Sequence, residues 1–522
     1  MSARRRGLLL ASAAALVIAV VVVVIVLVAG GGKSHSGTTT GASARTAAGA
    51  PATGAGRSSV VTVSPDTAGV TIAPGFLGLS IEYWATEAYA GKNPHAVNPV
   101  LARLIDDLAP GQTPVLRIGG VSTDQTFYPV SGVKRPPGVF YRLNTRRLAV
   151  MKGLAELTGA KLIMGITFEA DSRLFAGAEA RAMVSVIGPS HIDAFELGNE
   201  PELYGNPAFS WYTRNGKGVT GRSANYGPSQ FASDFAGIGS ALPDSVPLAG
   251  PASGASNWLD DLGPFLTSEP RIGVVTVHRY PFEACAVAPS SPSYPTVSRL
   301  LSPLGTVDQA GGLTPYVAVA HAHHVPIRIG EMNTVGCGNP PVVPNSFAEA
   351  LWALDVLFAY AQTGVDGVNV HTWPGAIYNL FNFKKSPAGW QATVEPEYYG
   401  LLMFAQAAPA GSRLVKAASS NAKIRAWATR APDGTVRVTL INDSTTATER
   451  LAVDVSGAAG SGSLTRLLAP SAAATSGVTI GGQGLGATGE PTGTAVVTTV
   501  APSGGGYDVS LPAASAALLT LR

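Results

Sequence analysis

The segment Ile192 to Tyr204, I-D-A-F-E-L-G-N-E-P-E-L-Y, decides the fold prediction. Its apolar run stops at a Gly-Asn-Glu-Pro sequence, which indicates a strand that ends with Asn199 and Glu200 at its tip. A second segment, Val325 to Asn333, repeats the pattern as V-P-I-R-I-G-E-M-N and places Glu331 after a β-branched run. Barrels of parallel strands carry their chemistry at the carboxyl ends of the strands. The two segments therefore predict a barrel with a glutamate at the end of each of two strands.

The rest of the chain supports this architecture. Counted from Leu77 onward, the chain has eight strand-like apolar runs, and helical or loop segments separate most of them. This alternation predicts an α/β fold with a (β/α)₈ TIM barrel over residues 76–400. Past Leu402 the pattern changes to alternation with period two, which predicts a C-terminal antiparallel β-sandwich over residues 401–522. Residues 60–75 read as two short strands without a helix partner, and we expect them to join this β domain.

The N-terminus carries a targeting pattern. Three arginines precede an uncharged run of 22 residues from Leu8 to Ala29, which is long enough to cross a bilayer. Residues 1–30 are therefore predicted to be a transmembrane anchor at the cell membrane with the catalytic part outside. A long signal peptide that is cleaved to release a secreted protein is the alternative. The Gly-, Ala-, Thr- and Ser-rich residues 31–59 are expected to be a flexible linker.

Charge excludes one class of partner. The formal net charge of the 522-residue chain is +3, but six of its 36 basic residues and none of its 33 acidic residues precede Val60. The exported body therefore has a net charge of about −3, which argues against nucleic acid or another long polyanion as its partner.

Two cysteines, Cys285 and Cys337, occur in the whole chain. Each follows a strand-like run, so in a barrel they would lie on neighbouring loops above the active face. In an exported protein this predicts a disulfide. Metal ligation is the alternative, although two isolated cysteines without a paired Cys or His make a poor site. The histidines of the predicted helix Pro315–His324 are expected to be solvated, so neither a metal nor another cofactor is predicted.

Two glutamates at strand ends are the arrangement that a glycosidase needs. Three blocks sharpen this expectation: G-N-E-P at 198–201, H-x-Y-P at 278–281, and G-E-x-N with a following cysteine at 330–337. Together they resemble glycoside hydrolase family 79, the β-glucuronidase and heparanase-like family of glycosidase clan A. The resemblance extends from about Phe76 to Trp373 and continues into the β domain.

The resemblance implies a retaining mechanism. Glu200, after the fourth barrel strand, would be the general acid/base, and Glu331, after the seventh, would be the nucleophile. In retaining enzymes the two carboxyl groups lie about 5–5.5 Å apart. The clan pattern further implies that Asn199 holds the sugar 2-hydroxyl and that Tyr280 donates a hydrogen bond to Glu331.

Other residues are candidates for substrate binding. Glu82 and Asp124 end the first and second strands and are predicted to bind sugar hydroxyls, with capping carboxylates as the alternative. The family loop that holds the substrate carboxylate has a tyrosine and a glycine. Here only Gly338 is present in that loop, and Tyr378 is the candidate substitute for the tyrosine. Two further groups end strands. His278 is expected to be a structural histidine, and His371 with Trp373 is a candidate sugar platform, with a place in the core as the alternative.

The sequence thus predicts a retaining O-glycosyl hydrolase, an exo-acting β-glucuronidase on the termini of glycans or glycosides. The expected partners are a carbohydrate substrate and, through the N-terminal helix, a membrane. The alternatives are another clan A activity, such as an arabinofuranosidase or a xylan-active enzyme, and a non-catalytic cell-surface protein that binds glycans. We expect the β domain to buttress the barrel.

Overall fold

The computed structural model describes residues 59–206, 211–341 and 343–522. The predicted anchor at residues 1–30 and all but the last residue of the predicted linker lie outside these ranges. A search of the described helices for one long and apolar enough to cross a membrane finds none.

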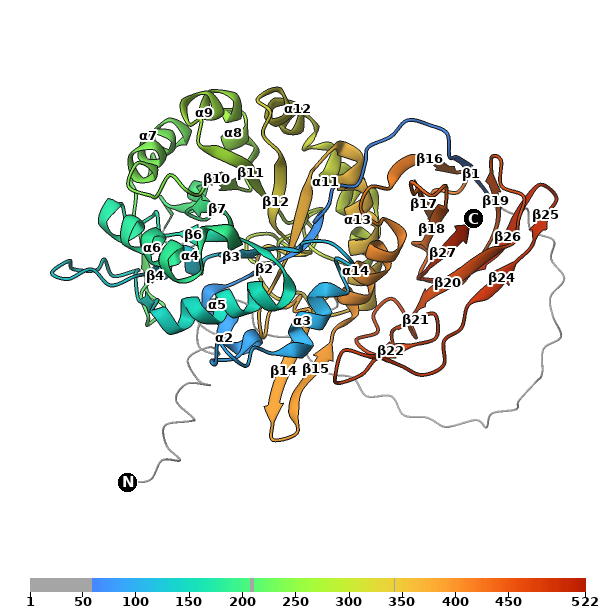
Figure 1. The fold of residues 1–522 in the computed structure, drawn as a ribbon. Helices are drawn as coiled ribbons and strands as arrows, with labels where there is room; N and C mark the ends of the chain where they lie inside the picture. The colour runs from blue at the N-terminus through green and yellow to red at the C-terminus, as the bar shows by residue number, and fades with distance from the viewer. Residues whose placement is uncertain (1–58, 207–210, 342) are drawn as a thin grey trace, which may run out of the picture. The chain divides into compact units, whose positions relative to one another are not determined.

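Eight parallel strands form a closed barrel (Figure 1), which confirms the predicted (β/α)₈ fold. Around the ring, β2 is followed by β3, β6, β7, β10, β11, β12 and β13, which pairs with β2 again. These strands are fully or almost fully buried because side chains fill the inside and helices cover the outside. Their bounds are Leu77–Ile81, Val115–Ile118, Lys161–Ile166, Ile192–Leu197, Leu248–Ser253, Ile272–Arg279, Ile327–Met332 and Gly367–Thr372.

Helices connect the barrel strands. The longer ones are α3 (Pro99–Asp106), α5 (Thr145–Thr158), α6 (Arg173–Val186), α7 (Pro228–Gly239), α9 (Leu262–Ser268), α12 (Thr314–Ala322) and α13 (Phe347–Thr363). Shorter pieces are α2 (Tyr83–Ala90), α4 (Ser122–Gln125), α8 (Ser256–Leu259), α10 (Val297–Leu300), α11 (Val307–Gly311), η2 (Pro189–His191), η3 (Pro201–Leu203) and η4 (Pro303–Gly305). Local sequence sets their ends: at α5, the Asn144 side chain accepts from Arg147 N, and Gly159 ends the helix in the left-handed conformation.

The C-terminal domain is a β-sandwich, as predicted. Its larger strands are β16 (Arg413–Ser419), β17 (Ile424–Arg430), β18 (Val436–Asn442), β19 (Glu449–Val455), β20 (Gly462–Leu468), β26 (Gly506–Leu511) and β27 (Ser515–Leu521). The short strands are β21 (Thr479–Ile480), β24 (Thr498–Val500) and β25 (Pro502–Ser503). Alternate side chains such as Val438, Leu440, Val453 and Leu519 fill its core.

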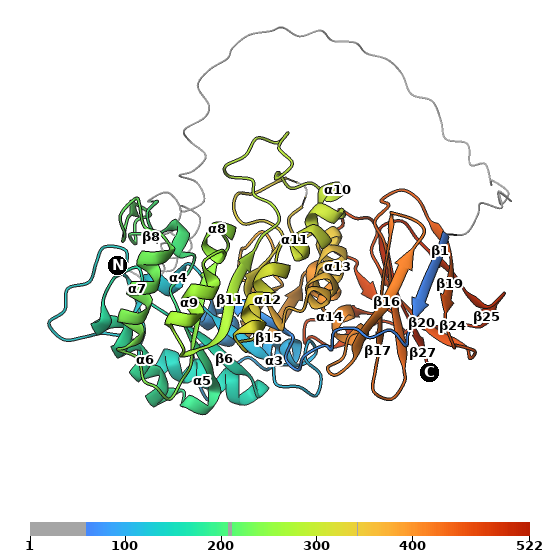
Figure 2. The ribbon, with the colours of Figure 1, turned by 90° about the horizontal axis from the view of Figure 1, so that it is seen from above.

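The strand β1 (Ser59–Ser64) lies far from the other strands of this sheet in sequence. It is antiparallel to β16 and parallel to β19, and Figure 2 shows it in blue among the orange and red strands. The second short strand expected before the barrel does not form. Instead, the chain follows the start of β16 through an isolated bridge between Thr71 and Arg413 and a hydrogen bond from Ile72 N to Ser412 O.

The helix α14 (Pro396–Ala407) joins the two domains and spans the domain boundary expected at residue 400. It packs against α13, which is buried along almost its whole length. Across the junction, Trp427 of β17 stacks on Phe358 of α13 at 5.7 Å and donates to Asp355 Oδ1 at 2.7 Å. Large buried surfaces of this kind fix domains to one another, in line with a buttressing β domain.

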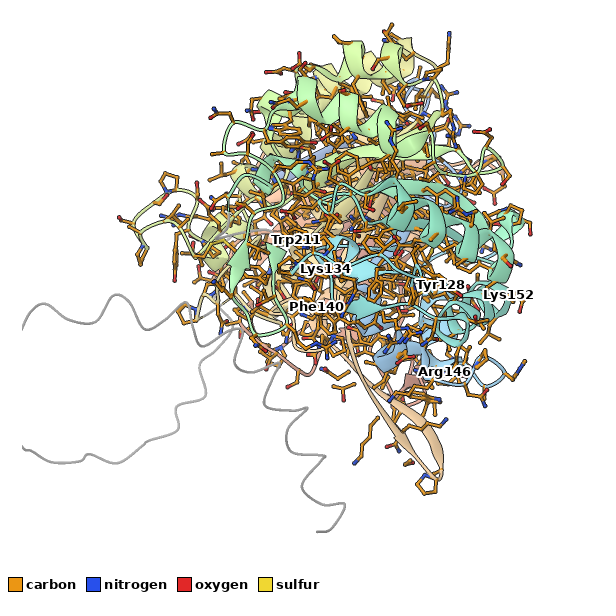
Figure 3. All side chains as sticks on the ribbon, turned by 90° about the vertical axis from the view of Figure 1, so that its left-hand side faces the viewer. Tyr128, Lys134, Phe140, Arg146, Lys152 and Trp211 are labelled. Atoms are coloured by element: carbon orange, nitrogen blue, oxygen red, sulfur yellow. A yellow bond between two sulfur atoms is a disulfide. The ribbon has the colours of Figure 1, made fainter. Side chains whose placement is uncertain are left out.

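Four two-stranded sheets form outside the barrel and the sandwich in the described part of the chain. The largest, β14 (Phe381–Ser386) with β15 (Gly389–Val394), projects from the barrel in Figure 1. Two smaller hairpins are β8 (Trp211–Tyr212) with β9 (Gly218–Val219) and, in the C-terminal part of the chain, β22 (Gly484–Leu485) with β23 (Pro491–Thr492). The short strands β4 (Thr126–Phe127) and β5 (Tyr141–Arg142) pair in parallel instead. Trp211 packs against Gly138, which lies in the loop between β4 and β5. Figure 3 labels Trp211 and Phe140, another residue of this loop.

Candidate active site

Glu200 and Glu331 meet at the carboxyl ends of β7 and β12. One oxygen from each carboxylate and a ring nitrogen of His278 all lie within 4.8 Å of one another. Glu200 has a φ of 51° and a ψ of 60°, a left-handed conformation that costs a residue other than glycine roughly 1–3 kcal/mol. The hydrogen bond from Glu200 N to Ala252 O, 2.9 Å long, ties this strained turn to the end of β10. The fold thus holds Glu200 in a conformation that directs its carboxylate toward Glu331.

Glu331 is held as an anion. Tyr280 Oη donates to its Oε1 at 2.8 Å, and Arg117 Nη1 donates to its Oε2 at 2.6 Å. Burial alone would raise the pKa of Glu331, but the charges of His371, His278 and Arg117 and the Tyr280 hydrogen bond together lower it well below its usual range. A buried carboxylate that stays ionised can act as a nucleophile.

Arg117 of β3 is the centre of the charge network, and the sequence analysis missed it. Its side chain is completely buried, and it forms ion pairs with Glu196 as well as Glu331. Burial lowers the pKa of Arg117, but those two carboxylates raise it above its usual value. The available signal was a charged residue inside the apolar run V-L-R-I at 115–118. Such a residue is almost never buried without a partner.

Asn199 is oriented by two neighbours. Its Oδ1 accepts from Arg117 Nη2 at 2.9 Å, and its backbone N donates to Tyr204 Oη at 3.0 Å. Within the described ranges, no residue accepts a hydrogen bond from its Nδ2 group. The side-chain amide is therefore available to donate to a ligand beside Glu200.

Both strand-end histidines belong to this network. His278, expected to be structural, is buried and places Nδ1 3.1 Å from Glu200 Oε1. Burial lowers the pKa of His278, but the Glu331 charge and the hydrogen bond to Glu200 raise it overall. His371, considered as part of a sugar platform, is also buried. Its Nδ1 lies 2.9 Å from Ser80 Oγ and 3.7 Å from Glu331 Oε2, so it contributes polar contacts to the site.

The two other strand-end carboxylates differ in environment. Glu82 accepts from Ser122 through Oε2, while its Oε1 lies 3.6 Å from Nε2 of His371, the histidine beside Glu331. Asp124, predicted to bind sugar hydroxyls or to be a capping carboxylate, makes its hydrogen bonds within the protein. Its Oδ1 accepts from the backbone N of Phe168 and Glu169, and its Oδ2 accepts from Tyr204 Oη at 2.7 Å. Both oxygens are therefore used to hold the loop that follows β6.

The two residues considered for holding the substrate carboxylate, Gly338 and Tyr378, have different neighbours. Tyr378 is buried beside the site, with its ring 6.0 Å from that of Tyr280 and 5.2 Å from that of Trp373. Gly338 has a φ of 86° and lies against Ala284, where a Cβ atom would come within 2.8 Å of that neighbour. Gly338 thus packs into the loop that follows β11, while Tyr378 lies beside the tyrosine that contacts Glu331.

The predicted disulfide between Cys285 and Cys337 is confirmed, with a Cα–Cα distance of 5.5 Å. It joins the loops after β11 and β12, the strands that carry Tyr280 and Glu331. In the chain-entropy model, closing this loop of 52 residues contributes about 4 kcal/mol to stability.

Three buried carboxyl groups beside the site were not singled out in the sequence. Burial and the Glu200 charge raise the pKa of Glu202 to about 7. Burial also raises the pKa of Glu397 to about 8, and its neighbour Glu349 shifts in the same direction. These last two groups accept from Asn333 Nδ2 and Thr334 Oγ1, directly after β12. They anchor the segment that follows Glu331.

A metal does not fit the carboxylate cluster. In the part of the chain that the structure describes, Glu200, His278 and Glu331 are close enough for one ion. However, the Arg117 guanidinium already neutralises Glu331 at 2.6 Å, and a divalent ion there would face that positive charge. His321, in the histidine-rich helix, is instead bonded to Asp366 at 2.8 Å.

Comparisons with known proteins agree with this geometry. Residues 417–518 match the model for the glycosyl hydrolase family 79 C-terminal beta domain. A β-glucuronidase of Aspergillus niger is 24% identical over 415 residues, which cover 72% of this chain and 73% of the relative. The resemblance to glycoside hydrolase family 79 is confirmed. This family resemblance and the clan A fold make the chain a glycoside hydrolase of the clan A type.

Solved structures of other glycosidases share the fold. A 4-O-α-L-rhamnosyl-β-D-glucuronidase from Fusarium oxysporum 12S matches with a TM-score of 0.67 at 18% identity, over 88% of this chain and all of that one. The family 51 arabinofuranosidase from Xanthomonas axonopodis pv. citri matches with a TM-score of 0.63 at 16% identity, over 89% of this chain and all of that one. At these identities the likeness shows the shared fold.

Proposed function

We propose that the protein is a retaining glycosidase in which Glu331 is the nucleophile and Glu200 is the general acid/base. The observation that carries this proposal is that a carboxylate oxygen of Glu200 and a carboxylate oxygen of Glu331 lie within 4.8 Å of each other. Retaining enzymes separate the two groups by about 5–5.5 Å, whereas inverting enzymes leave about 6.5–9.5 Å for a water molecule.

Each residue then has a step to perform. Glu331 attacks the anomeric carbon while Glu200 delivers its proton to the leaving oxygen, and a glycosyl ester forms on Glu331. Glu200 next removes a proton from water, which attacks the same carbon and releases the sugar. Arg117 and Tyr280 keep Glu331 ionised before the attack, and the free amide of Asn199 supports binding of the sugar 2-hydroxyl.

For the substrate we propose a β-linked glucuronic acid unit. The Aspergillus niger relative is named a β-glucuronidase, and the Fusarium oxysporum structure is of a β-D-glucuronidase. Tyr378, buried beside Tyr280, supplies a hydroxyl for the sugar carboxylate in place of the missing loop tyrosine. An arabinofuranosidase activity is the second candidate, because the family 51 fold is almost as similar.

Export of the catalytic part is also proposed. The apolar run from Leu8 to Ala29 supports an anchor or a signal peptide. The disulfide between Cys285 and Cys337 supports an oxidising compartment, where such bonds persist.

A side-by-side assay tests the activity. We expect kcat/KM for an aryl β-D-glucuronide to exceed that for an aryl α-L-arabinofuranoside by at least about 100-fold, since a site built around one polar group rejects substrates that lack it. The reverse preference would assign the arabinofuranosidase activity. No turnover on a broad panel of aryl glycosides, with binding retained, would identify a glycan-binding protein and refute the enzyme proposal.

A further inference from the structure

Two strained backbone turns meet at the candidate acid/base. Glu200 has a φ of 51°, and Ala252, near the end of β10, has a φ of 56°. Both values lie in the left-handed region, which residues other than glycine occupy only where surrounding contacts hold them there. One such contact joins the two residues directly, because Glu200 N donates to Ala252 O at 2.9 Å. The placement of Glu200 therefore depends on the end of β10.

Glu202 makes a second connection between the same two segments. Its Oε1 accepts a hydrogen bond from Gly254 N at 2.6 Å, just after β10, and its Oε2 is buried. Only Pro201 separates Glu202 from Glu200, and the proline ring fixes the backbone angle φ at that position. A displacement of Glu202 is therefore passed to Glu200 through a short and stiff piece of chain.

The peptide group of Gly254 is also held from its other side. Arg279 Nη1 donates to Gly254 O at 2.8 Å and to His278 O at 3.2 Å. His278 in turn places Nδ1 3.1 Å from Glu200 Oε1. These contacts lead from Glu202 through Gly254, Arg279 and His278 back to Glu200. The steps proposed for hydrolysis give Glu202 no part, yet this buried acid closes the circuit around the proton donor.

We propose that Glu202 is a positioning residue, whose hydrogen bond from Gly254 fixes the turn that aims the Glu200 carboxyl at the leaving oxygen. The inference rests on the proposed function and deepens it, because it names the side chain that sets the reach of the proton donor. Without this hydrogen bond the turn relaxes, and Glu200 protonates the leaving oxygen less effectively. Attack by Glu331 on the anomeric carbon is unaffected, because its contacts lie on other strands.

The dependence on the leaving group separates proton donation from the other steps. Phenoxide leaves poorly and needs the proton, whereas 2,4-dinitrophenoxide leaves without one. The test measures kcat/KM on the phenyl and the 2,4-dinitrophenyl β-D-glucuronide, which reports the steps up to the glycosyl-enzyme. Glu202→Ala should lower this value at least about tenfold on the phenyl substrate, as part of the 10²–10⁴-fold that general acid catalysis supplies. On the dinitrophenyl substrate the loss should stay below about twofold, because no proton is required there.

Glu202→Gln tests whether the hydrogen bond carries the effect. Burial and the Glu200 charge raise the pKa of Glu202 to about 7, so in more acidic solution the group is neutral and glutamine matches it in shape and charge. The glutamine oxygen can still accept from Gly254 N, so the ratio of the two kcat/KM values should stay near that of the wild type. Glu202→Asp is one methylene too short for this contact and should behave like Glu202→Ala, for which it stands in if the alanine variant does not fold.

The matched control is Glu179→Ala, which removes another buried glutamate that accepts from a backbone N–H after a barrel strand, Thr167 N at 3.0 Å. Any loss in this variant should be equal on the two substrates. Equal losses in Glu202→Ala, or an alanine-like ratio in Glu202→Gln, overturn the positioning role and leave the proposed function intact. Glu200→Ala should itself lose far more on the phenyl substrate. A Glu200→Ala variant without this preference, or a wild type that hydrolyses neither glucuronide, refutes the proposed function.

Discussion

Glu331→Ala is expected to lower kcat on an aryl β-D-glucuronide by on the order of 10⁴-fold, because no other group can form the covalent intermediate. KM should change much less, since the remaining contacts still bind the sugar. Azide is small enough to occupy the space that the carboxylate leaves. Adding azide should therefore restore part of the turnover and yield the α-configured glycosyl azide, the product of a single displacement.

The control for this result is Glu156→Ala, which removes an exposed glutamate on α5 whose one ion pair with a described residue is to Lys152 at 3.7 Å. Its kcat should match the wild type within about twofold, as expected for a surface residue. Glu331→Ala activity above about one hundredth of the wild-type value, without azide, would show that another residue is the nucleophile.

Arg117→Met is expected to cause the largest loss of stability. The substitution leaves Glu196 and Glu331 buried without their shared cation, and breaking a buried ion pair in this way costs about 3–5 kcal/mol. Arg117→Lys should recover only part, because one ammonium cannot reproduce the separate guanidinium contacts to Glu196, Glu331 and Asn199. Denaturant unfolding at pH 7 measures the effect.

The same variant has a predictable pH dependence. The pKa of Glu331 is lowered in the folded wild type, so its ion pair adds stability that is fully present above the unfolded pKa of about 4.3 and is lost as the pH falls. The difference between wild type and Arg117→Met should therefore shrink in acid. The double variant Arg117→Met/Glu196→Gln should be more stable than the single one. A free energy of unfolding for Arg117→Met within about 1 kcal/mol of the wild type at pH 7 would contradict this account.

The fold was predictable where local pattern carries the information. Buried barrel strands appear in the sequence as short apolar runs, and both catalytic candidates follow such runs directly. We could predict that β1 joins the C-terminal β domain because no helix follows it in the sequence. Its parallel pairing with β19, across almost the whole chain, had no local signal. The hairpin of β14 and β15 was missed because its strands are largely polar and exposed.

Residues of the candidate site that follow the ends of strands could be named from the sequence, whereas those inside strands could not. Arg117 and Glu196 lie inside barrel strands, and nothing near either residue in the sequence indicates a partner 79 residues away. The protein contacts of Asp124 were equally unpredictable from its local sequence. Its position at a strand end suggested a ligand, but the backbone N–H groups of Phe168 and Glu169 that occupy it are set by the neighbouring strand β6. Long-range pairing, rather than residue type, separates binding carboxylates from structural ones.

The central claim is that Glu200 and Glu331 act by two successive displacements at one carbon. The most direct test is the anomeric configuration of the first-formed sugar, followed by proton NMR during hydrolysis of an aryl β-D-glucuronide. The account predicts that the β-anomer appears first and then mutarotates to the equilibrium mixture. First release of the α-anomer would mean a single displacement by water and would contradict the roles assigned to both glutamates.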